Sequence, residues 1–166
     1  RTRRGSSNLV RSGWGGDCAS SQGNERQTFL DLMEATGRAT GVVSTARVTH
    51  AKPAATYAHV PERNWESDDS LTDEAKTNGC KDIADQLVSY DLGDGIDVVL
   101  GGGRRHFLPA ADGGKRADSR ALTPEWQDAK EGLDSSPRDG ATEQEVDHAD
   151  MRKDARATGR VAARLP

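Results

Sequence analysis

GVVSTARVTHAKPAATYAHVPERNW, residues 41–65, joins a short β-branched run to a polar segment rich in histidine and arginine. The run predicts a strand over residues 40–46, in which Val42 and Val43 are expected to be buried. α/β proteins usually place reactive groups in the loop after a strand, because the sheet holds the backbone still while the loop side chains reach solvent. Four loop side chains are therefore expected to carry exposed chemistry: His50, Lys52, His59 and Arg63.

The loop after this strand is suited to an anion, because its polar side chains are cations or potential cations. Arg63 has the planar fork that matches phosphate oxygens with two parallel hydrogen bonds, which a lysine cannot reproduce. On the residues alone, an ordinary surface arginine stays open as the alternative. The stretch thus predicts a generic anion site.

Patterns on either side of this stretch predict a helix–strand unit that occurs twice. A helix is predicted over residues 27–35, capped by Asn24, with Phe29, Leu30 and Met33 as its apolar face. Further helices are predicted over residues 54–58, 71–76, 80–90 and 122–130, and a second strand over residues 96–100. Crossovers that join parallel strands are almost always right-handed, so both strands are expected in one parallel sheet. The predicted fold class is α/β, a partial and mostly parallel sheet flanked by helices.

The composition limits the chain to one domain or part of a larger one. Of its 166 residues, 33% are hydrophobic, 4% aromatic and 30% charged, which predicts a thin core. The net charge of −4 and the scattered basic residues argue against a nucleic-acid footprint. No run approaches the roughly 18 apolar residues that span a bilayer, and the N-terminus lacks the apolar region of a signal peptide. Any export signal is therefore expected outside this sequence.

Two further features are ambiguous on the residues alone. Gly101, Gly102 and Gly103 follow the second strand, but they match no phosphate-loop pattern, so a tight strand exit is the preferred interpretation. Cys18 and Cys80 are too far apart for a CxxC redox or zinc motif. Their spacing favours buried thiols and leaves a disulfide open.

Four segments, in this order and at approximately this spacing, resemble the alkaline phosphatase family in its bacterial form. They are DCASSQGNE from residue 17, TGVVSTARVTHA and PAATYAHVPERNWE between residues 40 and 66, NGCKDIADQL from residue 78 and GIDVVLGGGRRHFLP from residue 95. The resemblance divides the chain into a poorly matching segment 1–16, an alkaline phosphatase-like α/β region 17–126 and a charged tail 127–166. It implies that the chain is an interior piece of the family's larger α/β sandwich.

The resemblance assigns roles to individual residues. Arg63 matches the family's phosphate-binding arginine, and His50 matches a position near the magnesium site that acts through bound water. His59 matches a recurrent histidine, for which a structural role is favoured. Cys18 and Cys80 match a disulfide found in many members, which implies an oxidising compartment and thus a periplasmic or secreted enzyme.

Lys52 departs from the family pattern. Members have Thr or Ser at this position, where a hydroxyl oxygen binds magnesium, whereas an ammonium has no lone pair to donate. A magnesium site is therefore doubtful. Three explanations stay open: an error in the sequence, loss of magnesium in this protein, or a lysine whose charge replaces that of the metal.

The function implied by the resemblance is hydrolysis of small phosphate monoesters through a phosphoserine intermediate, in a homodimer with two zinc ions. The serine nucleophile and the zinc ligands are expected outside this chain, so the 166 residues alone are expected to be inactive. Two alternatives remain. One is a sister phosphodiesterase or sulfatase of the same superfamily, and the other is a catalytically dead phosphate-binding or structural protein.

Overall fold

Two parallel strands form the sheet, β1 (Gly41–Arg47) and β2 (Val98–Gly102). Gly41 pairs with Val98 and Arg47 with Gly102, with an irregularity in the register between Val43 and Arg47. The structure is a computed structural model that describes residues 17–23 and 25–134. The α-helices are α1 (Cys18–Ser21), α2 (Phe29–Glu34), α3 (Ala51–Ala54), α4 (Asp73–Thr77), α5 (Ile83–Val88) and α6 (Leu122–Asp134). Three 3₁₀ helices complete them: η1 (Asp68–Ser70), η2 (Arg104–His106) and η3 (Ala110–Asp112).

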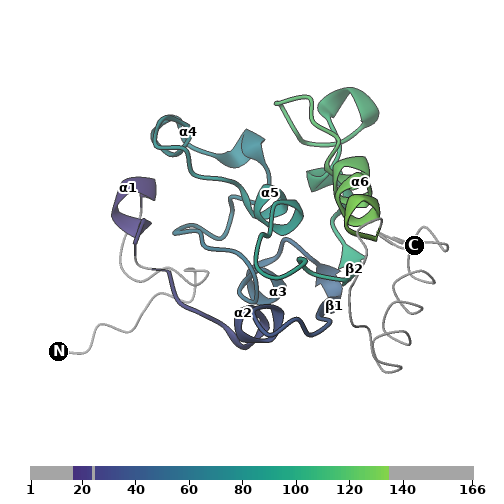
Figure 1. Cartoon of the computed structure of the whole chain (residues 1–166). Helices are drawn as coiled ribbons and strands as arrows, with labels where there is room; N and C mark the ends of the chain where they lie inside the picture. The colour runs from purple at the N-terminus through teal and green to yellow at the C-terminus, as the bar shows by residue number, and fades with distance from the viewer. Residues whose placement is uncertain (1–16, 24, 135–166) are drawn as a thin grey trace.

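The chain between the two strands makes a long crossover that contains α3, α4 and α5, as a parallel pair requires. α3 packs against β1, α5 against α6, and α1 against α4 (Figure 1). The predicted α/β class with a partial parallel sheet is therefore confirmed. Aromatic and aliphatic side chains from the crossover fill the core, among them Tyr57, Trp65, Ile83 and Ile96.

The predicted burial of the first strand is half right. Val42 is 5% exposed and belongs to the core, whereas Val43 is 72% exposed. Successive side chains of a strand point to opposite faces of the sheet, and the core cluster contains Val42 but not Val43. Two adjacent β-branched residues therefore indicated the strand correctly without indicating which of them is buried.

The predicted apolar face of the first helix is only partly right, because Leu30 packs against the core but Phe29 does not. Phe29 is 74% exposed, whereas Asp31 and Glu34 are buried. Thr28 caps α2 in a capping box with Asp31, whose carboxylate also accepts a hydrogen bond of 2.5 Å from the Tyr90 hydroxyl. The polar residues Asp31 and Glu34 therefore face the rest of the molecule, and Asp31 fixes the helix by its hydrogen bonds. The proposed cap, Asn24, lies outside the described residues.

The remaining boundaries follow local caps. α5 begins at Ile83 rather than near residue 80, because the Asp82 side chain accepts from the Asp85 N–H at 2.9 Å. α3 begins four residues after the end of β1, earlier than predicted, with His50 at its N-cap. α6 starts at the predicted residue 122 but runs to 134, across the proposed boundary at residue 126.

A disulfide joins Cys18 and Cys80, whose Cα atoms lie 6.0 Å apart. It connects α1 to the segment that follows α4. The Glu74 carboxylate strengthens the same contact by accepting from the N–H groups of Cys18 and Ala19, each at 3.1 Å. The disulfide implied by the family resemblance is thus confirmed, and the alternative of buried thiols is wrong.

Gly101 and Gly102 are the last two residues of β2, which ends two residues later than predicted, and Gly103 makes the strand exit. Gly103 has φ +98°, a backbone conformation that favours glycine. A Cβ on Gly101 would lie 2.7 Å from Val48 Cγ1, so glycine lets the ends of β1 and β2 approach closely. The exit places His106, in η2, against the end of β1.

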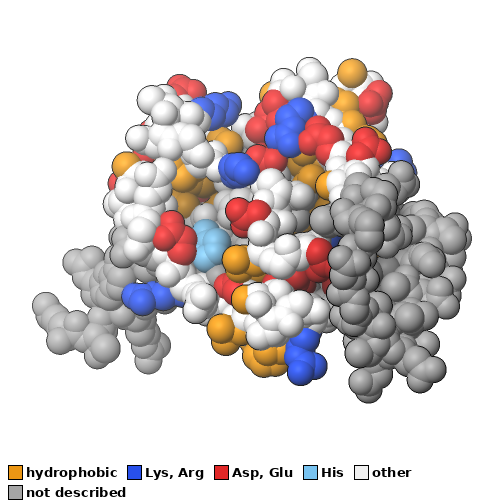
Figure 2. All heavy atoms as spheres, viewed as in Figure 1, with side chains coloured by type: hydrophobic (Ala, Val, Ile, Leu, Met, Phe, Trp, Pro, Cys, Tyr) orange, Lys and Arg blue, Asp and Glu red, His pale blue; other side chains and the backbone are white. Residues whose placement is uncertain are grey.

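The surface carries charges of both signs. On the face shown in Figure 2, basic and acidic side chains are interspersed, and apolar side chains are visible between them. Among the described helices, none is long and apolar enough to cross a membrane.

Candidate functional site

Arg63 and His50 meet just beyond the end of β1, with Arg63 Nη2 3.0 Å from His50 Nε2. A guanidinium has no acceptor, so Arg63 donates and His50 Nε2 accepts. The Nε2 lone pair of His50 is therefore engaged by Arg63. The structure brings together two residues that the sequence analysis placed at an anion site.

The turn after β1 fixes His50. Its N–H donates to Arg47 O at 2.9 Å, and its carbonyl accepts from Ala54 N–H at 2.9 Å, in the first turn of α3. His50 is the N-cap residue of α3, although its side chain makes no capping hydrogen bond. The imidazole thus projects from a backbone position held on both sides and is available to Arg63.

Arg63 lies in a tight turn anchored by Trp65, which is 3% exposed. Trp65 N–H donates to Glu62 O at 3.2 Å, and Glu66 N–H donates to Asn64 O at 2.8 Å. Arg63 itself is half-buried. The turn therefore presents a cation to solvent from a fixed base, which suits the binding of an anion.

Glu66, which directly follows the Arg63 turn, connects that turn to the end of β1. Its carboxylate accepts from Arg47 Nε and Nη2, both at 2.8 Å, and from Thr49 Oγ1 at 2.6 Å. The hydrogen bonds from Arg47 and Thr49 outweigh the effect of burial and lower the pKa of Glu66 to about 2. Glu66 is thus ionised at neutral pH, and the Arg47 contact is a bidentate ion pair.

His106 lies on the other side of Glu66, with Nε2 3.4 Å from Glu66 Oε2. Burial lowers the pKa of His106 to about 4 despite the nearby Glu66 carboxylate, so the imidazole is neutral at pH 7. Its Nδ1 lies 2.9 Å from Ser67 Oγ, and that hydroxyl donates to Asp69 at 2.6 Å. His106 therefore carries its hydrogen on Nδ1, donates to Ser67 and completes a buried polar network beneath the site.

The sequence analysis missed Arg47, Glu66 and His106. Arg47 and Glu66 are 19 residues apart, and no local pattern pairs them. The available signal was their placement: Arg47 lies within the quoted stretch at the end of the predicted strand, and Glu66 directly follows the stretch at the end of the loop. His106 could only be linked to them once the register of β1 and β2 was known.

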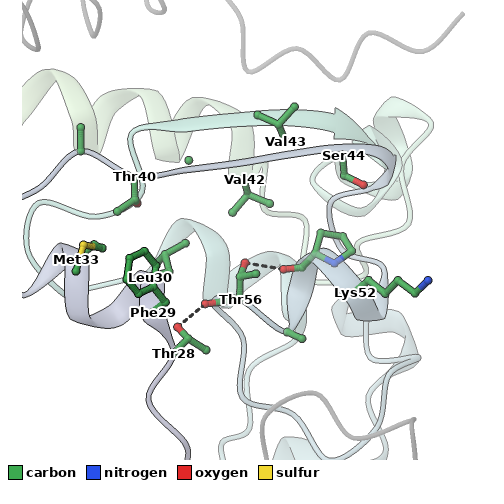
Figure 3. Close-up of a pocket in the computed structure, with 14 residues that line it drawn as sticks. Thr28, Phe29, Leu30, Met33, Thr40, Val42, Val43, Ser44, Lys52 and Thr56 are labelled. Carbon is green, nitrogen blue, oxygen red and sulfur yellow. Dashed lines mark hydrogen bonds between the residues drawn. The ribbon is translucent and has the colours of Figure 1, made fainter.

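Lys52 lies apart from the Arg63–His50 pair. It lines a groove of about 650 Å³ formed by β1, α2 and α3, which neither Arg63 nor His50 lines. Figure 3 shows the Lys52 side chain extending away from the apolar residues of this groove, Phe29, Leu30 and Val42. This groove is thus mostly apolar and is distinct from the cationic site.

His59 is also separate from the Arg63–His50 pair. Its backbone N–H donates to Gln86 Oε1 at 2.7 Å, and its carbonyl accepts from Gln86 Nε2 at 3.1 Å. The residue lines a different groove, of about 450 Å³, together with Tyr57 and Tyr90. These backbone contacts connect the segment after α3 to α5, and the structural role of the His59 side chain stays a prediction.

A second buried ionic cluster surrounds Arg116, whose side chain is 1% exposed. Its guanidinium donates to both oxygens of Asp82 at 3.2 Å and to Asp118 Oδ1 at 3.0 Å. Burial opposes the charge on Arg116, but the hydrogen bonds to Asp118 and Asp82 raise its pKa above the ordinary value. All of these donors are matched by carboxylates, so the cluster connects α5 to the segment before α6.

The described residues do not fit a metal site. They contain no group of three or more His, Cys, Asp or Glu side chains that could hold a metal ion. Both cysteines form the disulfide, and Lys52 places an ammonium where the resemblance implies a hydroxyl ligand for magnesium. Within residues 17–23 and 25–134, the Arg63–His50 pair stays the candidate site, and anion binding there stays a prediction.

Comparisons with known proteins point to one family. The family model for alkaline phosphatase matches residues 11–136. A membrane-bound alkaline phosphatase of Bombyx mori is 44% identical over 112 residues, 63% of this chain and 20% of the relative. The human tissue-nonspecific isozyme of alkaline phosphatase is 46% identical over 92 residues, 55% of this chain and 17% of the relative. The chain thus spans about a fifth of the length of the curated relatives it matches. These relatives come from animals, and the bacterial type stays a prediction.

Proposed function

The chain belongs to the alkaline phosphatase family, and from this premise we propose that the full-length protein hydrolyses phosphate monoesters through a phosphoserine intermediate. The observation that carries the proposal is the Arg63–His50 pair, 3.0 Å apart, in a chain that the family model matches over residues 11–136. The relatives are named for phosphatase activity. The serine nucleophile is proposed to lie outside these 166 residues, which alone are expected to show no turnover.

Arg63 is proposed to bind the phosphoryl group. Two parallel N–H donors of a guanidinium match two phosphate oxygens, and the same contact stabilises negative charge that shifts during transfer. His50 accepts from Arg63 and thereby orients the guanidinium plane. In this role His50 also differs from a metal ligand, because its Nε2 lone pair is engaged by Arg63.

The metals of the family are proposed to depend on ligands outside this chain. Two zinc ions would supply activation of the serine and of the leaving group. The residues present do not fit magnesium, because Lys52 has no lone pair to donate. Comparing magnesium stimulation of the full-length protein with that of Lys52→Thr tests this: equal stimulation of both would show that position 52 is irrelevant to the metal.

We propose that the protein is exported to an oxidising compartment, either the periplasm or the exterior, and acts as a homodimer. The Cys18–Cys80 disulfide supports the compartment, because disulfides persist where thiols are not kept reduced. The homodimer rests on family membership alone. Cell fractionation of the full-length protein, followed by its molar mass from light scattering, tests both statements.

Hydrolysis of three chromogenic esters separates the proposal from its rivals. The full-length protein is expected to cleave p-nitrophenyl phosphate faster than bis(p-nitrophenyl) phosphate or p-nitrophenyl sulfate. A preference for the diester or for the sulfate would identify a sister enzyme. Phosphate binding with no turnover of any ester would identify a catalytically dead protein, and the proposed function would fail.

A further inference from the structure

Two charged contacts bridge the same pair of turns. Arg47 contacts Glu66. His50, three residues after Arg47, contacts Arg63, three residues before Glu66. The two turns therefore run antiparallel and are connected at both ends. The Arg63–His50 contact faces the anion site, and the Arg47–Glu66 contact lies beneath it.

The contact beneath the site is the more rigid of the two. Glu66 receives two hydrogen bonds from one guanidinium and a third from Thr49, and its side chain is 13% exposed. A carboxylate held by three donors in this geometry has little freedom to move. The Arg47 end is fixed as well, because Arg47 pairs with Gly102 in the sheet.

The backbone of the Arg63 turn is held from a different direction. Ile83 N–H donates to Trp65 O at 2.8 Å, and Ala84 N–H donates to Glu66 O at 3.3 Å. These bonds connect the turn to the first residues of α5. They do not connect the turn to β1. Within the described residues, Glu66 contacts Arg47 at the end of β1, and Arg63 contacts His50 just beyond it.

We propose that Glu66 is a positioning residue that sets the distance between Arg63 and the end of β1, and so orients Arg63 for a phosphoryl group. Loss of the carboxylate leaves the Arg47 guanidinium without its bidentate partner and frees the turn to move away from His50. Displacement of a binding group by about 1 Å can reduce the rate a hundredfold. This inference rests on the proposed function and extends it to a residue that touches no substrate.

The test uses the full-length protein and its competitive inhibition by inorganic phosphate. Glu66→Gln keeps the size of the side chain and removes its charge, so the inhibition constant is expected to rise roughly tenfold. Glu62→Gln is the matched control, because it removes the same charge one residue before Arg63, while the glutamine oxygen can still accept from Asn64 N–H as Glu62 Oε1 does at 3.1 Å. Its inhibition constant is expected to stay within about twofold of the wild-type value.

The double variant Glu66→Gln/Arg63→Ala distinguishes an effect of Glu66 on the position of Arg63 from a general loss of structure. If Glu66 acts through Arg63, Glu66→Gln has no further effect on phosphate inhibition in an Arg63→Ala background. A tenfold effect in both backgrounds, or no effect in either, overturns the inference. Arg47→Lys serves as a second variant if Glu66→Gln fails to fold, because a lysine cannot make the bidentate contact.

Failure of the proposed function gives a different pattern. In that case the wild-type protein either shows no turnover, so that no inhibition constant for phosphate can be measured, or prefers the diester or the sulfate as substrate. If only this inference fails, Arg63→Ala weakens inhibition while Glu66→Gln matches the wild-type protein.

Discussion

Arg63 and Lys52 are two cations of one loop with different surroundings. Arg63 is half-buried and donates to His50, whereas Lys52 is exposed at the rim of an apolar groove. The loop after β1 thus orients one cation through a neighbouring side chain. Charge alone does not separate these residues in the sequence, but the guanidinium geometry of Arg63 and its family position do.

The residues beneath Arg63 predict sensitivity to acid. The pKa of His106 is lowered from 6.5 to about 4 in the folded protein, mainly by burial, so the folded state favours the neutral imidazole. The free energy of unfolding is therefore expected to decrease as pH falls from about 6.5 to about 4, by on the order of 3 kcal/mol in total. Chemical denaturation at a series of pH values measures this slope.

Glu66 makes the free energy of unfolding depend on pH in a second interval, which lies below that of His106. Hydrogen bonds from Arg47 and Thr49 overcome the effect of burial and lower its pKa from 4.5 to about 2, so its contribution is lost as pH falls through that interval. His106→Asn keeps a polar side chain but removes the titration. This variant should reduce the change in the free energy of unfolding between pH 6.5 and 4, while the decrease at lower pH that is due to Glu66 remains. An unchanged slope in the variant would contradict the assignment.

Candidate site residues were predicted where a single residue type carries the chemistry. Arg63 and His50 stand out by their side chains and by their place after a strand. Glu66 and His106 could not be predicted, because their roles depend on partners 19 and 40 residues away. Such partners become neighbours only through the register of β1 and β2 and the position of α5.

At the scale of elements, patterns indicated where the strands and helices lie more reliably than which faces they bury. Both strands and the parallel sheet were predicted, since β-branched runs bounded by glycine are strong signals. The face of α2 was predicted only in part: Leu30 packs against the core, but Asp31 and Glu34 are also buried, through specific hydrogen bonds rather than hydrophobicity. Periodicity alone gives no information about such bonds.

The cap of α2 provides a prediction at this scale. Thr28→Ala removes the hydroxyl that accepts from Asp31 N–H at 3.2 Å and donates to Thr56 O at 2.9 Å. The free energy of unfolding is expected to fall by about 1 kcal/mol. Thr28→Ser keeps the hydroxyl and is expected to cost only a few tenths of that. An equal loss in both variants would show that the methyl group, rather than the cap, is responsible.

At the scale of the molecule, the disulfide closes a long segment of a chain with few large apolar side chains. Cys18 and Cys80 are separated by 62 positions, and the bond lies on the side of the molecule that carries α1 and α4 (Figure 1). A disulfide that closes such a loop restricts the unfolded chain, and this contributes strongly to the stability of a protein with a thin core.

Removal of the disulfide is expected to lower the free energy of unfolding by about 2–5 kcal/mol. Thermal unfolding measured with and without a reducing agent checks this. The reducing agent should lower the Tm of the wild-type protein and leave that of the Cys18→Ser/Cys80→Ser variant unchanged. Equal melting of the reduced and oxidised wild-type protein would contradict the expectation.

The most direct test of the account is the inhibition constant of inorganic phosphate for the full-length protein, measured for wild type, Arg63→Ala and Arg38→Ala. Arg38 is an exposed arginine and serves as the charge-matched control. The account predicts that Arg63→Ala weakens phosphate inhibition roughly a hundredfold, while Arg38→Ala stays close to wild type. Equal constants for Arg63→Ala and wild type would contradict the claim that Arg63 binds the phosphoryl group.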